Sequence, residues 1–189
     1  MKIGLFFGSF NPFHIGHKLI GSYISEFTNL DKVLFVVSPQ NPFKEKKSLL
    51  EQNHRLQIIR ADIEDSIKLG VSDIEFHLPN PSYTIDTLVK INEKNPENEY
   101  SIIIGSDNLS TLHKWKNYKQ ILENYSIYVY PRHGFEFAVS HKNIHLINEA
   151  PKVEISASFI RKSIRERKDV SYLIPEKAWK YISEMNFYK

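Results

Sequence analysis

Short apolar runs, separated by segments with helical periodicity, constrain the fold of this chain more than any other feature. Residues 3–7, 33–37 and 100–104 are dominated by apolar side chains, the pattern of strands that are buried on both faces of a parallel sheet. Between the first two runs, apolar residues recur at helical spacing over residues 16–27. This order predicts a right-handed β–α–β crossover, and the chain is therefore expected to form an α/β fold.

The remaining sequence continues this alternation and then becomes helical. Further strands are expected over residues 74–76, 126–130 and 144–147, and further helices over residues 50–67, 85–92, 115–124, 156–167 and 175–185. In the helix over residues 50–67, Arg55 is expected on the solvated face, and residues 41–48 are expected to form a loop. We expect one domain over residues 1–189, a Rossmann-like parallel sheet flanked by helices, with a helical C-terminal extension over about residues 156–189.

The composition narrows the class of protein. The chain has no cysteine, which excludes disulfides, thiolate chemistry and the common cysteine-containing zinc sites. Its formal net charge of +3 weakly favours anionic ligands, but the clustered basic stripe typical of nucleic-acid-binding proteins is missing from the sequence. No apolar stretch is long enough for a signal peptide or a membrane span. We expect a cytoplasmic protein that acts on small phosphates, not on nucleic acid or a membrane, and the sequence leaves open whether it forms a homo-oligomer.

The segment that follows the first strand is the strongest candidate for a site. Ligands of open parallel sheets bind beyond the carboxyl ends of the strands, and the first such end carries GSFNPFHIGH at residues 8–17. Gly8 and Gly16 are expected to leave room for a phosphate, while Ser9, Asn11 and the amides at the start of the helix offer hydrogen-bond donors. The segment predicts a phosphate-binding loop without the lysine of a Walker motif.

His14 and His17 lie three residues apart at the entry to this helix. If the turn is helical, both imidazoles point the same way, beside the positive end of the helix dipole. Such a pair can stabilise the charge that develops while a phosphoryl group is transferred. One alternative is that a histidine caps the helix or packs against the sheet, and another is a metal-binding pair, for which no third ligand is evident.

Four segments resemble one family, in the expected order. GSFNPFHIGH (residues 8–17) resembles the N-terminal signature of the HxGH nucleotidyltransferase superfamily, and ISASFIR (residues 155–161) resembles its distal ISSTxIR motif. SYTIDTL (residues 82–88) and the segment from residue 105 to Trp115 are similar to those of the bacterial nicotinate-nucleotide adenylyltransferases. The resemblance implies that ATP and nicotinate mononucleotide are joined into nicotinate adenine dinucleotide, with release of pyrophosphate and the assistance of Mg²⁺, in NAD biosynthesis.

The resemblance also assigns roles to individual residues. Catalysis falls to His14 and His17, which would hold the phosphates of ATP. The implied ATP-binding residues are Gly8, Ser9, Phe10, His14, His17, Gly105, Asp107, Ser158 and Arg161. The implied acceptor-binding residues are Lys44, Tyr83, Thr84 and Trp115. No residue is assigned as a metal ligand.

For two basic residues the sequence leaves a second interpretation open. Arg161 lies in the first turns of a helix that Ser156 or Ser158 could cap, where its guanidinium could grip the β- and γ-phosphates. The alternative for Arg161 is a position on a solvated basic helix. Lys44 could neutralise phosphate charge, but the lysines at positions 46 and 47 are equally available for this role.

The nucleoside and acceptor residues have simple structural alternatives too. Asp107 follows a buried strand and could bind ribose hydroxyls, or it could cap the next helix. Trp115 could stack on the pyridine ring or belong to the core. Tyr83 and Thr84 could present amides to the carboxylate of the pyridine, or could merely begin a helix.

Three positions depart from the commonest pattern of the family. Asn11 stands in place of an aspartate, Phe43 in place of a histidine and Ala157 in place of a serine, and none of these changes removes a proposed catalytic group. Within the superfamily, an enzyme that uses nicotinamide mononucleotide or phosphopantetheine is the alternative. Outside it, the alternative is a nucleotide-sensing or nucleic-acid-binding module that keeps the phosphate loop without turnover.

Overall fold

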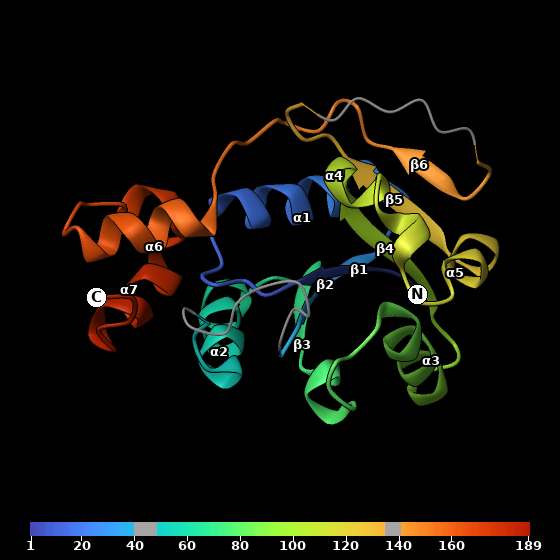
Figure 1. Cartoon of the computed structure of the whole chain (residues 1–189), viewed down its shortest axis with the longest axis horizontal. Coiled ribbons are helices and arrows are strands. Elements are labelled where there is room, and N and C mark those ends of the chain that lie inside the picture. Colours follow the sequence, from blue (N-terminus) through green and yellow to red (C-terminus); the bar gives the residue numbers. More distant parts are fainter. Residues whose placement is uncertain (40–48, 135–140) are drawn as a thin grey trace.

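A six-stranded parallel sheet forms the centre of the molecule (Figure 1). The computed structural model describes residues 1–39, 49–134 and 141–189. The strands are β1 (Lys2–Gly8), β2 (Lys32–Val37), β3 (Leu69–Ser72), β4 (Glu99–Gly105), β5 (Ser126–Tyr130) and β6 (Ile144–Leu146). Their order is β3-β2-β1-β4-β5-β6, and every neighbouring pair is parallel. The strand order reverses between β1 and β4, and a doubly wound sheet offers its ligand site at such a point.

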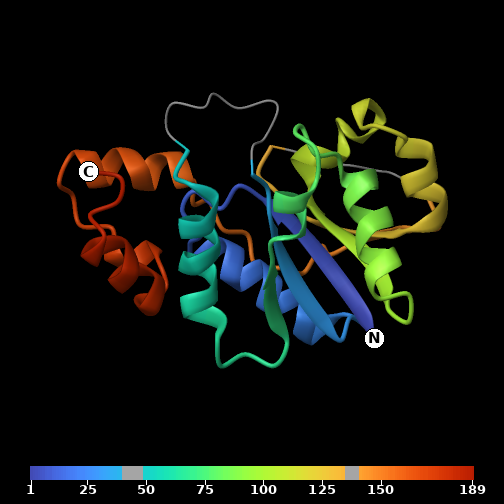
Figure 2. The same cartoon turned by 90° about the horizontal axis from the view of Figure 1, so that it is seen from below.

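Helices cover both faces of the sheet. They are α1 (Ile15–Phe27), α2 (Gln52–Ile63), α3 (Thr84–Lys94), α4 (Ser106–Leu109), α5 (Tyr118–Asn124), α6 (Ala157–Arg165) and α7 (Glu176–Glu184), with short 3-10 turns η2 (Ile74–His77), η3 (Leu112–Lys114) and η4 (Ser171–Leu173). Successive side chains of a strand point to opposite faces, so Phe6 packs with α1, α2, α6 and α7, whereas Leu5 packs with α3 and α5. Figure 2 shows the sheet between these two groups of helices. The buried apolar runs predicted from the sequence therefore line two cores.

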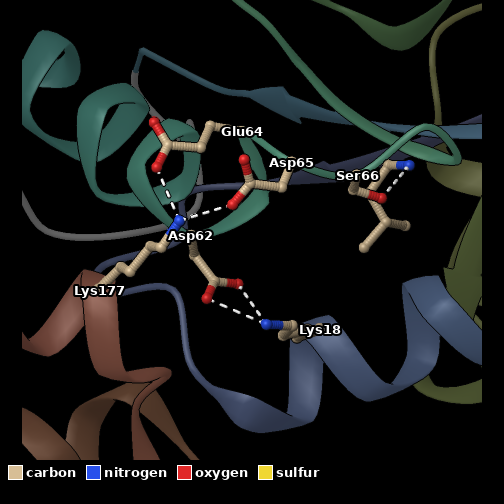
Figure 3. Close-up of polar contacts among 7 residues, drawn as sticks. Lys18, Asp62, Glu64, Asp65, Ser66 and Lys177 are labelled. Atoms are coloured by element: carbon tan, nitrogen blue, oxygen red, sulfur yellow. Dashed lines mark hydrogen bonds and ion pairs between the residues drawn. The ribbon is translucent and has the colours of Figure 1, made fainter.

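The C-terminal helices α6 and α7 lie beside α2 at one end of the molecule (Figure 1). Ion pairs fix the C-terminal end of α2 in this arrangement (Figure 3). Lys18 on α1 lies 3.0 Å from the carboxylate of Asp62, and Lys177 on α7 lies 2.7 Å from both Glu64 and Asp65. The helical extension is thus packed against the first half of the fold, next to the helix that carries the HxGH motif.

Three secondary-structure predictions need correction. Residues 74–76 do not form a strand: the third strand is β3, and residues 74–77 form the turn η2. The helix predicted over residues 50–67 ends at Ile63, after which the Ser66 hydroxyl accepts a hydrogen bond from the Leu69 amide and turns the chain into β3. The helix predicted over residues 115–124 begins only at Tyr118, as α5, because Asn117 before it adopts a left-handed backbone conformation with φ of 54°. The turn η3 (Leu112–Lys114) precedes the predicted range.

The other predicted strands and helices are confirmed to within a few residues. The loop predicted over residues 41–48 lies outside the described residues. None of the helices that the structure describes combines the length and the apolar character that crossing a membrane requires.

Candidate active site

The HxGH segment lies at the carboxyl end of β1, beside the point where the strand order reverses. His14 is the residue that precedes α1, and its carbonyl accepts hydrogen bonds from the amides of His17 and Lys18. The two imidazoles stack, with ring centroids 3.7 Å apart and ring planes 26° from parallel. The expectation that both rings lie on one side of the helix entry is confirmed.

Aromatic packing holds this pair in place. Phe10 and Phe13 are buried in the core and their rings approach the ring of His17, with centroids 5.0 and 5.7 Å away. The backbone of Phe10 has a φ of 45°, and its ring packs close to Gly8. Because the Phe10 side chain packs inward, any contact with a nucleotide would come from its backbone.

The glycines of the motif make room for neighbouring rings. A Cβ atom on Gly8 would lie 2.9 Å from the ring of Phe10, and a Cβ atom on Gly16 would lie 3.1 Å from the ring of His14. The space that was expected to admit a phosphate is therefore occupied by these side chains. Larger residues at positions 8 and 16 would displace the rings that build the site.

The environment of each histidine sets its hydrogen-bonding role. Burial, and secondly the charge of Arg132, lower the pKa of His14 to about 4, so its ring is neutral at physiological pH. In His17, Nδ1 accepts a hydrogen bond of 3.3 Å from the backbone amide of His14. A neutral His17 ring then carries its proton on Nε2 and can donate it to a ligand.

A small hollow opens beside these rings, which we call the β1 hollow. Its lining includes His14, Gly16, His17, Tyr130 and Arg132. It lies where the ends of β1 and β5 and the start of α1 meet, so donors from distant parts of the sequence face one space. The hollow is small, and it would hold one phosphate group more readily than a whole nucleotide.

Arg132 is a site residue that the sequence did not reveal. Its backbone amide donates a hydrogen bond to the Ser106 hydroxyl at 2.9 Å, and its guanidinium donates to the Tyr130 hydroxyl at 3.2 Å. The guanidinium also lies 3.5 Å from the carboxylate of Asp107, and its side chain is about half exposed. Its charge therefore stands at the edge of the hollow, within reach of a ligand.

The end of β4 contributes Gly105 and Asp107. The Asp107 oxygen Oδ1 is buried and lies 3.5 Å from Arg132 Nε, but it accepts no hydrogen bond of normal geometry from the described residues. A Cβ atom on Gly105 would lie 2.3 Å from this oxygen, so glycine is required for the carboxylate to occupy its position. A ligand hydroxyl could donate the hydrogen bond that this oxygen lacks.

Arg161 is not among the residues that line the β1 hollow, and it contacts the HxGH loop at Asn11 instead. Ser156 caps α6 by accepting the amide hydrogen of Phe159 at 3.1 Å, as expected for the start of this helix. The guanidinium of Arg161 donates to the Asn11 carbonyl at 2.6 Å and to the Ser158 hydroxyl at 3.3 Å. Arg161 thus contacts the HxGH motif through the backbone of Asn11, and Ser158 contacts the guanidinium of Arg161.

The predicted acceptor residues come from two neighbouring segments. Tyr83 precedes α3, Thr84 is its first residue, and Trp115 follows η3 as a partly buried side chain. Lys116 links the two segments, because its ammonium lies 2.9 Å from Asp86 on α3 and 4.8 Å from the centre of the Tyr83 ring. Lys44 and Phe43 lie outside the described residues.

A buried carboxyl group supports the acceptor segment. Glu75 in η2 is 3% exposed and accepts hydrogen bonds from the Thr87 hydroxyl at 2.8 Å and the Ser82 hydroxyl at 3.2 Å. Burial raises the pKa of this carboxyl group above its usual value, and the hydroxyl donors oppose the shift. Hydrogen bonds to Glu75 therefore hold the segment that carries Tyr83 and Thr84.

Comparison with known proteins now bears on these features. A family model described as cytidylyltransferase-like matches residues 5–163. The probable nicotinate-nucleotide adenylyltransferase of Flavobacterium johnsoniae is 52% identical over the full length of both chains. The chain belongs to the nicotinate-nucleotide adenylyltransferase family. Another member, the probable enzyme of Bacteroides thetaiotaomicron, is 41% identical over 97% of this chain and 92% of its own.

Solved structures agree with the family fold. The Plasmodium falciparum nicotinic acid mononucleotide adenylyltransferase complexed with NaAD superimposes with a TM-score of 0.81, covering 99% of this chain and 97% of its own at 22% identity. A putative nicotinate-nucleotide adenylyltransferase from Vibrio parahaemolyticus gives a TM-score of 0.73 at 23% identity, over 99% and 94% of the two chains. At this identity the likeness establishes the shared α/β fold of the family.

Proposed function

We propose that this chain transfers the adenylyl group of ATP to nicotinate mononucleotide, forming nicotinate adenine dinucleotide and pyrophosphate in NAD biosynthesis. The observation that carries this proposal is the placement of His14, His17 and Arg132 around one hollow at the switch point of the sheet. The names of the full-length relatives support the choice of substrates. The neighbouring complexes with NaAD and with APC agree with nucleotide ligands for this fold.

The reaction needs positioned donors more than a reactive side chain. An oxygen of the 5′-phosphate of the acceptor forms a bond to the α-phosphorus of ATP, and the bond from that phosphorus to the bridging oxygen of the β-phosphate breaks. Pyrophosphate leaves with the bonding electron pair, so negative charge grows on it during the transfer. Donors fixed beforehand in the right direction stabilise this charge without having to reorganise.

The described residues provide such donors around the β1 hollow. His14 supplies a neutral imidazole and His17 a ring N–H group, while Arg132 supplies a permanent positive charge. The first amides of α1 lie at the positive end of a 13-residue helix. We place the phosphates of ATP against this group. Arg161 and Ser158 would reach the same phosphates from beyond the loop if the nucleotide displaces the bond from Arg161 to the Asn11 carbonyl.

The remaining assignments follow the layout of the strand ends. Asp107, whose buried oxygen Oδ1 pairs with Arg132 but accepts no hydrogen bond from the described residues, would accept one from a ribose hydroxyl of ATP. The amides around Tyr83 and Thr84 would meet the carboxylate of the pyridine, and the ring of Trp115 would stack on it. Lys116, between these segments, is paired with Asp86, and its ammonium would bind the carboxylate of the pyridine if it exchanged that partner for the ligand.

The described part of the chain offers few ligands for Mg²⁺. Among the described residues, no group of three histidine or acidic side chains is arranged to bind a metal ion. Mg²⁺ is commonly bound through substrate phosphates with one or two carboxylates, and the site has one carboxylate in Asp107, beside Arg132. We therefore propose that the ion enters with ATP and shields the charge of its phosphates, while the side chains described above orient the substrates.

Release of pyrophosphate from ATP, measured side by side with three acceptors, tests this proposal. Nicotinate mononucleotide should be used well, and nicotinamide mononucleotide and phosphopantetheine poorly. Equal rates with the nicotinate and nicotinamide forms would overturn the choice of acceptor. Binding of ATP without turnover on any acceptor would instead favour a nucleotide-sensing role.

A further inference from the structure

Residues outside the HxGH loop bind it through the side chain of Asn11. This side chain is 5% exposed. Its oxygen Oδ1 accepts a hydrogen bond from the Tyr188 hydroxyl at 2.8 Å and another from the Leu50 amide at 3.2 Å. Asn11 lies three residues before His14, so these bonds act directly on the loop that delivers the catalytic histidine.

Two arginines hold the backbone of the same loop. Arg161 on α6 donates to the Asn11 carbonyl at 2.6 Å, and Arg55 on α2 donates to the Ser9 carbonyl at 2.6 Å. The guanidinium of Arg55 also donates to carbonyls of Ser38, Pro39 and Leu50, at 2.7, 2.9 and 2.7 Å. The loop is thus fixed by α2, by α6 and by the segment that contains Tyr188.

Tyr188 is well placed to act as a permanent donor. Burial raises the pKa of its hydroxyl far above the ordinary value, and the nearby charges of Arg55 and Arg161 only partly oppose this shift. The hydroxyl therefore keeps its proton at any physiological pH. A donor that does not titrate gives Asn11 a constant hydrogen bond.

The segment around Tyr188 is itself anchored on α2. The ring of Phe187 lies 4.7 Å from the ring of His54, and His54 shares a hydrogen bond of 3.1 Å with the Tyr181 hydroxyl. Tyr188 has a φ of 67°, in the left-handed region that a bulky residue rarely adopts. Such a conformation persists only where the surroundings impose it, and here it brings the hydroxyl to Asn11.

We propose that Tyr188 is a positioning residue for adenylyl transfer, which holds the HxGH loop through Asn11 and so keeps His14 aligned with the phosphates of ATP. This inference rests on the proposed function for its kinetic consequence. Tyr188 is not among the residues that line the β1 hollow, so its effect passes through the loop. A displacement of about 1 Å at a reacting centre can cost on the order of a hundredfold in rate.

The kinetic test compares Tyr188→Phe with Tyr172→Phe, a matched control at a side chain that is 67% exposed. Tyr188→Phe removes only the hydroxyl. We expect kcat to fall roughly tenfold, with the KM for nicotinate mononucleotide unchanged to within about twofold, because the loop faces ATP and not the pyridine. The control should retain wild-type values, and an unchanged kcat in Tyr188→Phe would overturn the proposal.

A double-mutant cycle then asks whether the effect runs through Asn11. In an Asn11→Ala background, Tyr188→Phe should lower kcat no further, because the partner of the hydroxyl is already gone. A full additional loss in that background would show that Tyr188 acts by another route, and the proposal would be wrong.

Hydrogen–deuterium exchange supplies a readout that is independent of the reaction. Peptides that cover residues 8–14 should exchange faster in Tyr188→Phe than in wild type or Tyr172→Phe, in the absence of any substrate. Unchanged exchange would overturn the positioning role. If the wild-type chain made no dinucleotide, the proposed function would fail, and this comparison would still decide whether Tyr188 holds the loop.

Discussion

Acidification should destabilise the native chain through one buried residue, His14. Burial, and secondly the charge of Arg132, lower the pKa of His14 from 6.5 to about 4. The unfolded chain therefore takes up this proton near pH 6.5 and the native chain only near pH 4. Between these values the unfolded state binds more protons than the native state. The contribution of neutral His14 to the free energy of unfolding is therefore fully present above about pH 6.5 and is lost as the pH falls towards 4. At about 1.4 kcal/mol per pH unit, the loss approaches about 3 kcal/mol at pH 4.

Urea unfolding of the wild type and of His14→Gln, from pH 7 to pH 4, isolates this contribution. Groups other than His14 affect both proteins alike, so the difference between their free energies of unfolding reports the missing titration. Wild type should lose about 3 kcal/mol more than the variant across this range. In an Arg132→Gln background the loss should be smaller, since one cause of the shift is removed. Parallel curves for wild type and His14→Gln would refute the reasoning.

Three further substitutions test the site and its supports. His17→Ala should lower turnover by on the order of a hundredfold while circular dichroism shows an intact fold, and unchanged turnover would remove His17 from the mechanism. Arg55→Met leaves four carbonyls without their donor and should lower the free energy of unfolding in urea by about 4 kcal/mol or more. The control Arg60→Met, at an exposed residue of the same helix, should lower it by less than about 0.5 kcal/mol. Equal losses would contradict the role of Arg55. Glu75→Gln removes one hydrogen-bond acceptor from the segment before α3. It should raise the KM for nicotinate mononucleotide roughly tenfold and leave the KM for ATP unchanged. Equal rises in both KM values would point to a general loss of structure.

The central strands could be predicted because burial on both faces leaves a continuous apolar run. β3 could not, since Leu69–Ser72 is a short run that contains a glycine and has no such pattern. The run at residues 74–76 places Glu75 between two apolar residues, and this alternation predicted a strand. Glu75 is instead buried and satisfied by hydroxyl donors, a tertiary contact that periodicity does not record.

The chemistry of the site was predictable where it is local in sequence. His14 and His17 come from one helix entry, so their spacing alone indicated a shared direction. Arg132 could not be predicted because its role arises from its own position after β5 and from partners on α4, which are distant in sequence. Arg55 was expected on the solvated face of its helix, and this was wrong. The residue is fully buried, and carbonyls from the β1–α1 and β2–α2 connections accept hydrogen bonds from its guanidinium.

A structure of the chain bound to a non-hydrolysable ATP analogue tests the central claim most directly. The account predicts phosphate oxygens within hydrogen-bonding distance of the imidazole nitrogens of His14 and His17 and of the guanidinium of Arg132, with a ribose hydroxyl on Asp107. Phosphates bound elsewhere on the sheet, with neither imidazole in contact with the analogue, would contradict this claim.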